Sequence, residues 1–411
     1  MPDALPPVPA PRILLADADA FYVAVARLED PAGAGRAPLL IVGGSAERRG
    51  VVTSASYEAR AFGVQSAMPM ARALRLCPQA TVVPVPWEAC QRKGEEIRAV
   101  LERFTPAVER ASSDEFYLDL SGTERLYHGE PLAGTARRIR AEVRAASGLT
   151  VSIGGGSSKL VAKLAAGRAK PHPGSPADGV RIVAPGTETA FLAEFALADL
   201  PGVGPRFQER LARVGLRAVT DAQRLSRPAL VALLGEREGA WLDQRVRGID
   251  PGVVTPHGDP KSISRDETFA RDLDTDEALN RELLRLAARA AGDLRAAGLA
   301  ARTITVRIRD ADFTDRQASR TVPAALVSDR AVMEVARPLL ARLRAARRVP
   351  ARLLGVALSQ FVPPDGGAQL ALFEGESAEP IETERDRAIS RVVDDVRERF
   401  GKDALGWAGE A

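Results

Sequence analysis

A short segment rich in proline and glycine divides this chain more sharply than any other feature of its sequence. Residues 249–260 read IDPGVVTPHGDP. Neither a regular helix nor a central strand tolerates such a density of proline and glycine. The chain has 411 residues, which is more than one hydrophobic core usually organises. We therefore expect two to four domains, with a linker at residues 249–260.

The strand and helix patterns on the two sides of this linker differ. Strand-like and helix-like segments alternate through the first 170 residues, which favours an α/β or α+β core. Residues 196–248 are expected to be helical, with residues 201–204 separating two of the helices. After the linker, the order is strand, helix, strand, strand, helix and strand, which predicts a compact βαββαβ sheet with its helices on one face. A further helix is expected at 384–399.

Composition excludes several classes of protein. The two cysteines, Cys77 and Cys90, are too few for a disulfide framework or a cysteine-based zinc site. No apolar stretch approaches the length of a membrane span. The first eleven residues, MPDALPPVPAP, lack the basic start and apolar run of a signal peptide. We expect a cytoplasmic protein that does not associate with membranes.

Charge is distributed unevenly along the chain. The formal net charge is only +3, which does not by itself indicate a nucleic-acid partner. Residues 289–352, however, carry 14 arginines and no lysine against 6 acidic residues. Such a stretch either contacts phosphate groups or forms the solvated faces of amphipathic helices, and charge alone does not separate these alternatives.

Two pairs of acidic residues are candidates for one metal site. Asp17 and Asp19 in DADAFY lie two apart on an expected strand and so share a face. Asp114 and Glu115 lie in SSDEFYLD, between two short expected strands, where a tight turn would aim both carboxylates at one point. Clustered carboxylates suit Mg²⁺ rather than zinc. The alternative is that these acids are separate, solvated groups at strand and loop ends.

Basic and hydroxyl residues form a second group of candidates. GVVTSASYEAR places Ser54 at a strand end, with Tyr57 and Arg60 on one face of the following helix. An arginine and two hydroxyl groups suit a polyphosphate, although the same pattern describes an ordinary capped helix start. Lys159, Lys163 and Lys170 are half of the six lysines in the chain. The preceding GGGSSK fails the phosphate-loop template, which excludes a P-loop ATPase.

Glycines in the helical region suggest contact with a nucleic-acid backbone. In LPGVGPRFQERL, Gly202 and Gly204 interrupt two expected helices and allow close approach of a ligand to the backbone. Such a hairpin grips phosphates without reading bases, or it is simply a helical connection.

Taken together, these motifs resemble those of the Y-family translesion DNA polymerases of the polymerase IV and kappa type. DADAFY, TSASYEARAFGVQSAMP, SSDEFYLD, KLVAKLAAGRAKP and LPGVGPRFQERL occur in the order of that family, and the resemblance covers about residues 12–362. It implies an α+β, right-hand polymerase. The implied parts are a ferredoxin-like palm at 12–20 and 78–175, small fingers at 21–77, a helical thumb with a helix-hairpin-helix at 176–248, a little finger at 261–362 and a tail at 363–411.

The resemblance also implies roles for individual residues. Asp17, Asp114 and Glu115 match the ligands of two Mg²⁺ ions, with the Ala18 carbonyl as a backbone ligand. Asp19 matches an acidic position that is not a principal ligand. Tyr22 resembles the steric gate that excludes ribonucleotides. The remaining implied contacts to the nucleotide triphosphate are Tyr57, Arg60, Lys170, Ser54 and the backbone of Phe21.

The chain departs from the family pattern at a few positions. Ala18 replaces a larger apolar residue, Ser113 replaces an aliphatic residue, and Gly155–Ser158 differs from the usual Val-Ala-x-Asn. None of these changes removes a ligand.

Past the last expected strand, Gln369, Leu370, Ala371, Leu372 and Phe373 are similar to the peptide with which bacterial polymerases bind the sliding clamp. Its alternative is a short amphipathic segment that packs on its own domain.

The function implied by this resemblance is template-directed, error-prone translesion DNA synthesis by a monomer. The substrates would be primer-template DNA and deoxynucleoside triphosphates, and the sliding clamp would be a partner. One alternative is a non-catalytic, polymerase-like scaffold, against which the intact carboxylate triad argues. A cyclase-like palm enzyme acting on free nucleotides is another, but it would need neither the thumb hairpin nor a clamp peptide.

Overall fold

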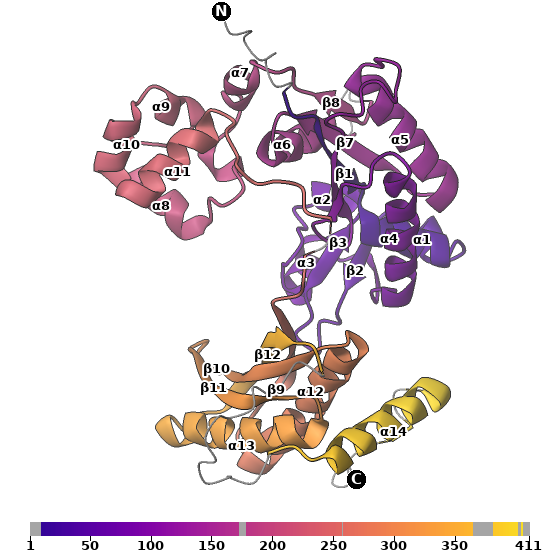
Figure 1. The fold of residues 1–411 in the computed structure, drawn as a ribbon, viewed down its shortest axis with the longest axis vertical. Helices are drawn as coiled ribbons and strands as arrows, with labels where there is room; N and C mark the ends of the chain where they lie inside the picture. The colour runs from indigo at the N-terminus through magenta and orange to yellow at the C-terminus, as the bar shows by residue number, and fades with distance from the viewer. Residues whose placement is uncertain (1–9, 172–177, 257, 365–380, 402–403, 406–411) are drawn as a thin grey trace, which may run out of the picture. The chain divides into compact units, whose positions relative to one another are not determined.

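The expected linker coincides with the boundary between two units of the chain that pack separately. The computed structural model describes residues 10–171, 178–256, 258–364, 381–401 and 404–405. The first unit comprises Met1–Ala46 and Gly50–Gly258, and the second comprises Glu47–Arg49 and Asp259–Ala411 (Figure 1).

A five-stranded sheet forms the centre of the first unit. Its strand order is β5-β6-β1-β7-β8. The central strand β1 pairs antiparallel with both β6 and β7, and every residue of β1 is buried. The strands are β1 (Ile13–Ala18), β5 (Val108–Arg110), β6 (Glu115–Asp119), β7 (Val151–Gly156) and β8 (Val180–Ile182).

Alternate residues of β1 explain how this sheet is covered on both faces. Leu14 and Ala16 belong to a large apolar cluster with residues of α4 (Trp87–Glu102) and α5 (Leu132–Ser147). Leu15 faces the other way, into a smaller cluster with residues of α6 (Lys159–Ala169). The period-two alternation of a strand thus gives one face to α4 and α5, and the other to α6.

Glycine at position 154 allows α6 to lie very close to β7. A Cβ atom built at Gly154 would lie 2.0 Å from the Ala166 nitrogen and 2.2 Å from the Ala162 oxygen. Ser158 caps the helix by accepting a hydrogen bond of 3.3 Å from the Val161 N–H. The departure from the family pattern at Gly155–Ser158 therefore lies in the strand end and turn that lead into α6.

A three-stranded sheet, of order β3-β2-β4, and short helices form a second layer within this unit. Its strands are β2 (Leu40–Gly43), β3 (Val52–Ala55) and β4 (Thr81–Val83). Its helices are η1 (Ala34–Arg36), α2 (Tyr57–Ala61) and α3 (Met70–Leu76). Because β4 pairs with β2, this sheet extends past residue 77, where the fingers were expected to end. Similarly, β8 extends the central sheet past residue 175.

The helix α1 (Phe21–Glu29) joins the two sheets, because Phe21 and Val25 pack in the same cluster as α4 and α5, while Val23 packs with β2. The helical region that follows packs around an apolar cluster that it shares with α6. Its elements are α7 (Glu188–Leu192), η2 (Leu197–Asp199), α8 (Pro205–Arg213), α9 (Val219–Gln223), α10 (Arg227–Leu234) and α11 (Glu236–Val246).

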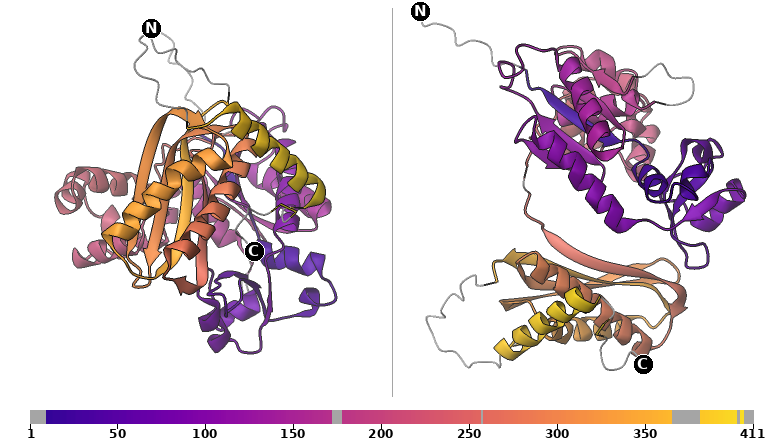
Figure 2. Two further views of the ribbon diagram at one scale, coloured as in Figure 1. Left: turned by 90° about the horizontal axis from the view of Figure 1, so that it is seen from below. Right: turned by 90° about the vertical axis from the view of Figure 1, so that its right-hand side faces the viewer.

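The second unit confirms the predicted βαββαβ order. Its four antiparallel strands have the order β11-β10-β12-β9, and α12 and α13 cover one face (Figure 2). The elements are β9 (Ser262–Leu273), α12 (Asp276–Ala296), β10 (Ala300–Asp310), β11 (Asp315–Leu326), α13 (Asp329–Ala346) and β12 (Ala351–Val362).

The expected C-terminal helix is present as α14 (Glu384–Phe400), and ion pairs fasten it to this unit. Arg295 of α12 is 2.7 Å from Asp329 and 2.6 Å from Asp394 of α14. Arg330 is 2.7 Å from Asp386. Among the described residues, no helix is both long enough and apolar enough to span a membrane.

Candidate active site

Strand pairing brings the three predicted carboxylate ligands to one edge of the central sheet. Asp17, near the end of β1, lies directly opposite Glu115, the first residue of β6. The Ala18 N–H donates a hydrogen bond of 3.0 Å to the carbonyl oxygen of Asp114. As expected, the turn between β5 and β6 is tight, since the N–H groups of Ala111 and Ser112 both donate to the Glu115 carbonyl.

Two lysines, Lys163 of α6 and Lys170 directly after this helix, hold two of these carboxylates. The Lys170 ammonium is 2.8 Å from a carboxylate oxygen of Asp17, and the Lys163 ammonium is 2.5 Å from one of Glu115. Burial raises the pKa of Asp17 to about 6, despite the opposing effect of Lys170. Burial acts to lower the pKa of Lys170, but Asp17, through its charge and hydrogen bond, together with Tyr57 and Asp19 outweighs burial and raises this pKa.

The other two acidic side chains are oriented by serines. Asp114 accepts a hydrogen bond of 2.7 Å from the Ser112 hydroxyl, and Asp19 accepts one of 2.6 Å from Ser152 of β7. Asp19 was expected on the same strand and face as Asp17. Since β1 ends at Ala18, Asp19 lies instead in the turn before α1, and its carboxylate is directed to Ser152.

The carboxylate oxygens at this sheet edge are ligands that suit a hard divalent cation. The ammonium groups of Lys163 and Lys170 supply positive charge at the same place. Each carboxylate of the Asp17–Glu115 pair already faces a positive charge at hydrogen-bond distance. In the part of the chain that the structure describes, however, no three acidic, histidine or cysteine side chains gather closely enough to hold one ion. Binding of a metal by all three carboxylates would therefore require these side chains to exchange their present partners.

Three of the predicted polyphosphate contacts, Ser54, Tyr57 and Arg60, lie on the neighbouring strand β3 and helix α2. The Arg60 guanidinium lies over the Tyr57 ring, 5.2 Å from its centroid, as their three-residue spacing predicts. Arg60 also donates to the Ala55 carbonyl at 2.9 Å and to the Ser54 hydroxyl at 3.5 Å. These contacts fix the guanidinium at the end of β3. Burial, and next the charge of Asp19, raise the pKa of the Tyr57 hydroxyl.

Tyr22 is held in place by aromatic neighbours and one hydrogen bond. Its ring meets those of Phe21 and Trp87 edge to face, with centroid distances of 5.3 and 6.0 Å. Its hydroxyl donates to the Ser113 hydroxyl at 3.3 Å. Ser113, one of the departures from the family pattern, thus links Tyr22 to the turn that carries Asp114 and Glu115.

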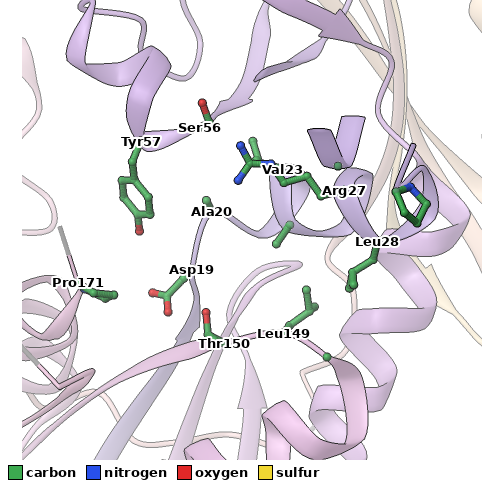
Figure 3. A pocket seen from close by; sticks show the side chains of 14 residues that line it. Asp19, Ala20, Val23, Arg27, Leu28, Ser56, Tyr57, Leu149, Thr150 and Pro171 are labelled. Carbon is green, nitrogen blue, oxygen red and sulfur yellow. The ribbon is translucent and has the colours of Figure 1, made fainter. Parts of the chain in front are cut away.

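A pocket of about 480 Å³ lies beside these residues (Figure 3). Its walls include one flank of α1, Leu149 and Thr150 before β7, and Tyr57. The Tyr57 hydroxyl and the Asp19 carboxylate point toward each other across it (Figure 3). Neither the Tyr57 hydroxyl nor one oxygen of Asp19 has a hydrogen-bond partner among the described residues, which leaves both able to bind a polar group.

The glycines of the expected helical hairpin are exposed, as their proposed use requires. Gly202 has a φ of 96°, and a Cβ there would lie 2.9 Å from the Trp241 ring. Gly204 precedes the first residue of α8, Pro205, and has open space around its Cα. The turn therefore needs glycine at 202 and leaves the backbone at 204 accessible.

Many arginines of the basic segment 289–352 form ion pairs with acidic residues of the second unit. Arg316 and Arg347 both bind Asp310, which is fully buried, and Arg344 binds Asp276. Much of the local positive charge is therefore neutralised by ion pairs, an outcome that neither alternative from the sequence anticipated.

The predicted clamp-binding residues, Gln369–Phe373, lie outside the described residues.

Sequence reasoning did not find the partners of these groups. It singled out Lys159 and Lys163 without a carboxylate for either, and it missed Ser152 and Trp87. A serine 133 residues from Asp19 and a tryptophan at a helix start carry no local signal. The pairing of β1 with β7 brings Ser152 to the site, and the packing of α4 in the same cluster as α1 brings Trp87.

Comparisons with known proteins identify the family of this chain. The model of the impB/mucB/samB family matches residues 16–167, that of its C-terminal domain matches 260–372, and the DNA polymerase-iota thumb domain matches 198–250. A DNA polymerase IV of Desulfatibacillum aliphaticivorans is 35% identical, with 96% of this chain and 95% of that protein covered. One of Caulobacter vibrioides is 36% identical, with 95% and 91% covered.

A solved structure with the same fold is a chimera of the Y-family DNA polymerases Dbh and Dpo4. It has a TM-score of 0.75 and 23% sequence identity, and the match covers 86% of this chain and 99% of that one. The sheets and helices described above therefore correspond to the expected right-hand architecture, including the helical thumb domain. On the strength of the family models and the full-length relatives, this chain belongs to the impB/mucB/samB family of Y-family, DNA-directed DNA polymerases.

Proposed function

We propose that this polymerase performs error-prone translesion synthesis, adding deoxynucleotides to a primer 3′ end opposite damaged template bases with the help of two Mg²⁺ ions. The observation that carries the proposal is the register of β1 and β6. This register places Asp17 opposite Glu115 at one edge of the sheet. Next to them, the Ala18 N–H donates a hydrogen bond to the Asp114 carbonyl oxygen.

In this proposal, Asp17, Asp114 and Glu115 hold the ions, and the Ala18 carbonyl is a further ligand. When bound, two such ions activate an attacking hydroxyl and stabilise a leaving pyrophosphate. The protein's part is to fix the carboxylates. Asp17 lies near the end of a fully buried strand, and the Ser112 hydroxyl orients Asp114. Asp114 and Glu115, at the turn, would align the primer 3′-hydroxyl.

The incoming nucleotide would lie between this edge and α2. Tyr57, Arg60 and Lys170 would bind the triphosphate, with Ser54 and the backbone of Phe21 as lesser contacts. Arg60 supports this role because its guanidinium is already oriented by the Ala55 carbonyl and the Tyr57 ring. Tyr22, braced by Phe21 and Trp87, would exclude a ribose 2′-hydroxyl by occupying its space.

Other parts of the chain would bind the DNA and its partners. Gly202 and Gly204 would contact the DNA backbone. Gln369–Phe373 would bind the bacterial sliding clamp, and the protein would act as a monomer in the cytoplasm.

Primer extension tests the proposal directly. The parent chain and Asp114→Ala with Glu115→Ala are compared on undamaged and abasic templates, with Mg²⁺ and deoxynucleotides. We expect extension of both templates by the parent and a loss of several orders of magnitude in the double variant, because a preorganised charge cluster carries the chemistry. Absence of extension by the parent, with DNA binding intact, would reject catalysis and favour the scaffold.

A further inference from the structure

The ion pair between Lys163 and Glu115 stands in the place of the proposed metal contact. The ammonium is 2.5 Å from the carboxylate, and the side chains are only 37% and 23% exposed. One turn earlier on α6, Lys159 makes a comparable pair with Glu109, at 2.6 Å. Glu109 lies on β5 and is not a proposed metal ligand. The chain therefore contains two similar lysine–glutamate contacts, of which only the one at Glu115 involves a proposed ligand.

A divalent cation and the Lys163 ammonium would repel each other if both bound the Glu115 carboxylate. Two positive charges a few ångströms apart repel each other strongly in a partly buried environment. Without either cation, however, Asp17, Asp114 and Glu115 would leave negative charges crowded at one sheet edge. An ammonium on Glu115 relieves that repulsion in the metal-free protein.

A lysine at position 163 suits a contact with Glu115 that must break when a metal ion binds. Only six of the 57 basic residues in this chain are lysines. An arginine would grip the carboxylate with two parallel hydrogen bonds, whereas lysine is a single point charge on a flexible stem. Lysine therefore neutralises the carboxylate and still leaves it readily.

We propose that Lys163 is an exchangeable counter-ion of Glu115, which occupies the carboxylate in the metal-free protein, is displaced when a divalent cation binds, and so lowers the affinity of the site for the cation. Lys163 is thus a positioning residue that tunes metal affinity. The inference rests on the proposed function, since it takes Glu115 as a metal ligand.

The test measures metal binding without turnover. Mn²⁺, a paramagnetic stand-in for Mg²⁺, is titrated into the metal-free full-length chain in the absence of DNA and nucleotide, and free Mn²⁺ is read by electron paramagnetic resonance. We expect Lys163→Gln to tighten Mn²⁺ binding by about tenfold, because a competing charge is removed. The matched variant Lys159→Gln should leave the dissociation constant unchanged.

Folding is monitored in parallel. Thermal unfolding in a chelator should show that both glutamine variants lose some stability, but only Lys163→Gln should gain more from added Mn²⁺ than the parent does. Should Lys163→Gln not fold, Lys163→Arg provides the test, since a bidentate arginine should weaken Mn²⁺ binding instead. Equal Mn²⁺ affinity in the parent and in the Lys163 variants would overturn the inference.

The outcome also separates this inference from the proposed function. If the parent extends primers but Lys163 has no effect on Mn²⁺ affinity, the polymerase stands and the counter-ion role fails. If Mn²⁺ affinity depends on Lys163 while the parent extends no primer, the counter-ion role stands and the proposed synthesis fails.

Discussion

Replacing Gly154 with alanine should force α6 away from β7. The added Cβ would lie 2.0 Å from the Ala166 nitrogen and 2.6 Å from the Ala165 carbonyl carbon, where ordinary contacts begin at 3.4 Å. Both neighbours are backbone atoms, which cannot rotate away. The helix must therefore shift by about 1.4 Å, the difference between 2.0 and 3.4 Å. Overpacking of this kind costs about 1–3 kcal/mol, and we expect the upper end of that range.

Gly167 provides the matched control. It lies in the same helix, it is exposed, and a Cβ there would meet no atom within 4 Å. Alanine at this position should stabilise α6 by about 0.5–1 kcal/mol, because glycine is the more flexible residue in a helix interior. The two glycine-to-alanine changes should thus shift the unfolding free energy in opposite directions.

Urea unfolding and hydrogen exchange measure the effect. The unfolding midpoint should fall for Gly154→Ala and rise slightly for Gly167→Ala, and amides of residues 159–169 should exchange faster only in the former. Primer extension should fall with Gly154→Ala, because α6 carries Lys163 and ends beside Lys170. An unfolding free energy for Gly154→Ala within about 0.5 kcal/mol of that of the parent, which is the range of neutral surface changes, would refute the argument.

Three further substitutions probe other contacts. Tyr22→Ala should raise ribonucleotide incorporation by about 10²-fold with little change for deoxynucleotides, as steady-state kinetics with both sugars would reveal. Arg60→Ala should raise KM for the nucleotide by about 10- to 100-fold, since it removes a charge-assisted contact that Tyr57 keeps oriented; an unchanged KM would exclude the contact. Arg295→Met should destabilise the chain by about 3–5 kcal/mol in urea unfolding, because it leaves the buried Asp329 without its cation. A loss below about 1 kcal/mol would show that Asp329 finds another partner.

Local patterns in the sequence predicted the elements with strong periodicity. The βαββαβ order after the linker is confirmed, because each element there is long and clearly alternating or helical. The contact of Arg60 with the Tyr57 ring also followed from spacing alone. The short strands β4 and β8 were missed as parts of their sheets. Each has only three residues, none of them buried, so the pattern of a strand core is absent.

Contacts between distant segments were beyond the sequence. Lys159 and Lys163 are equivalent in any local pattern, yet one pairs with Glu109 and the other with Glu115. Which carboxylate each receives depends on how far β5 and β6 extend past β1, and on the angle at which α6 crosses the sheet. Both depend on packing of the whole core, and in particular on the close approach at Gly154.

The scarcity of lysine has a practical consequence. Of the six lysines, Lys159, Lys163 and Lys170 lie on α6 or directly after it. An amine-reactive reagent would therefore direct half of its possible side-chain labels to this helix and the residue that follows it. Lysines bound to carboxylates react slowly, and lysines released from them react faster. Mass spectrometry of the labelled peptides would thus report which cation holds each carboxylate, without an engineered probe and without turnover.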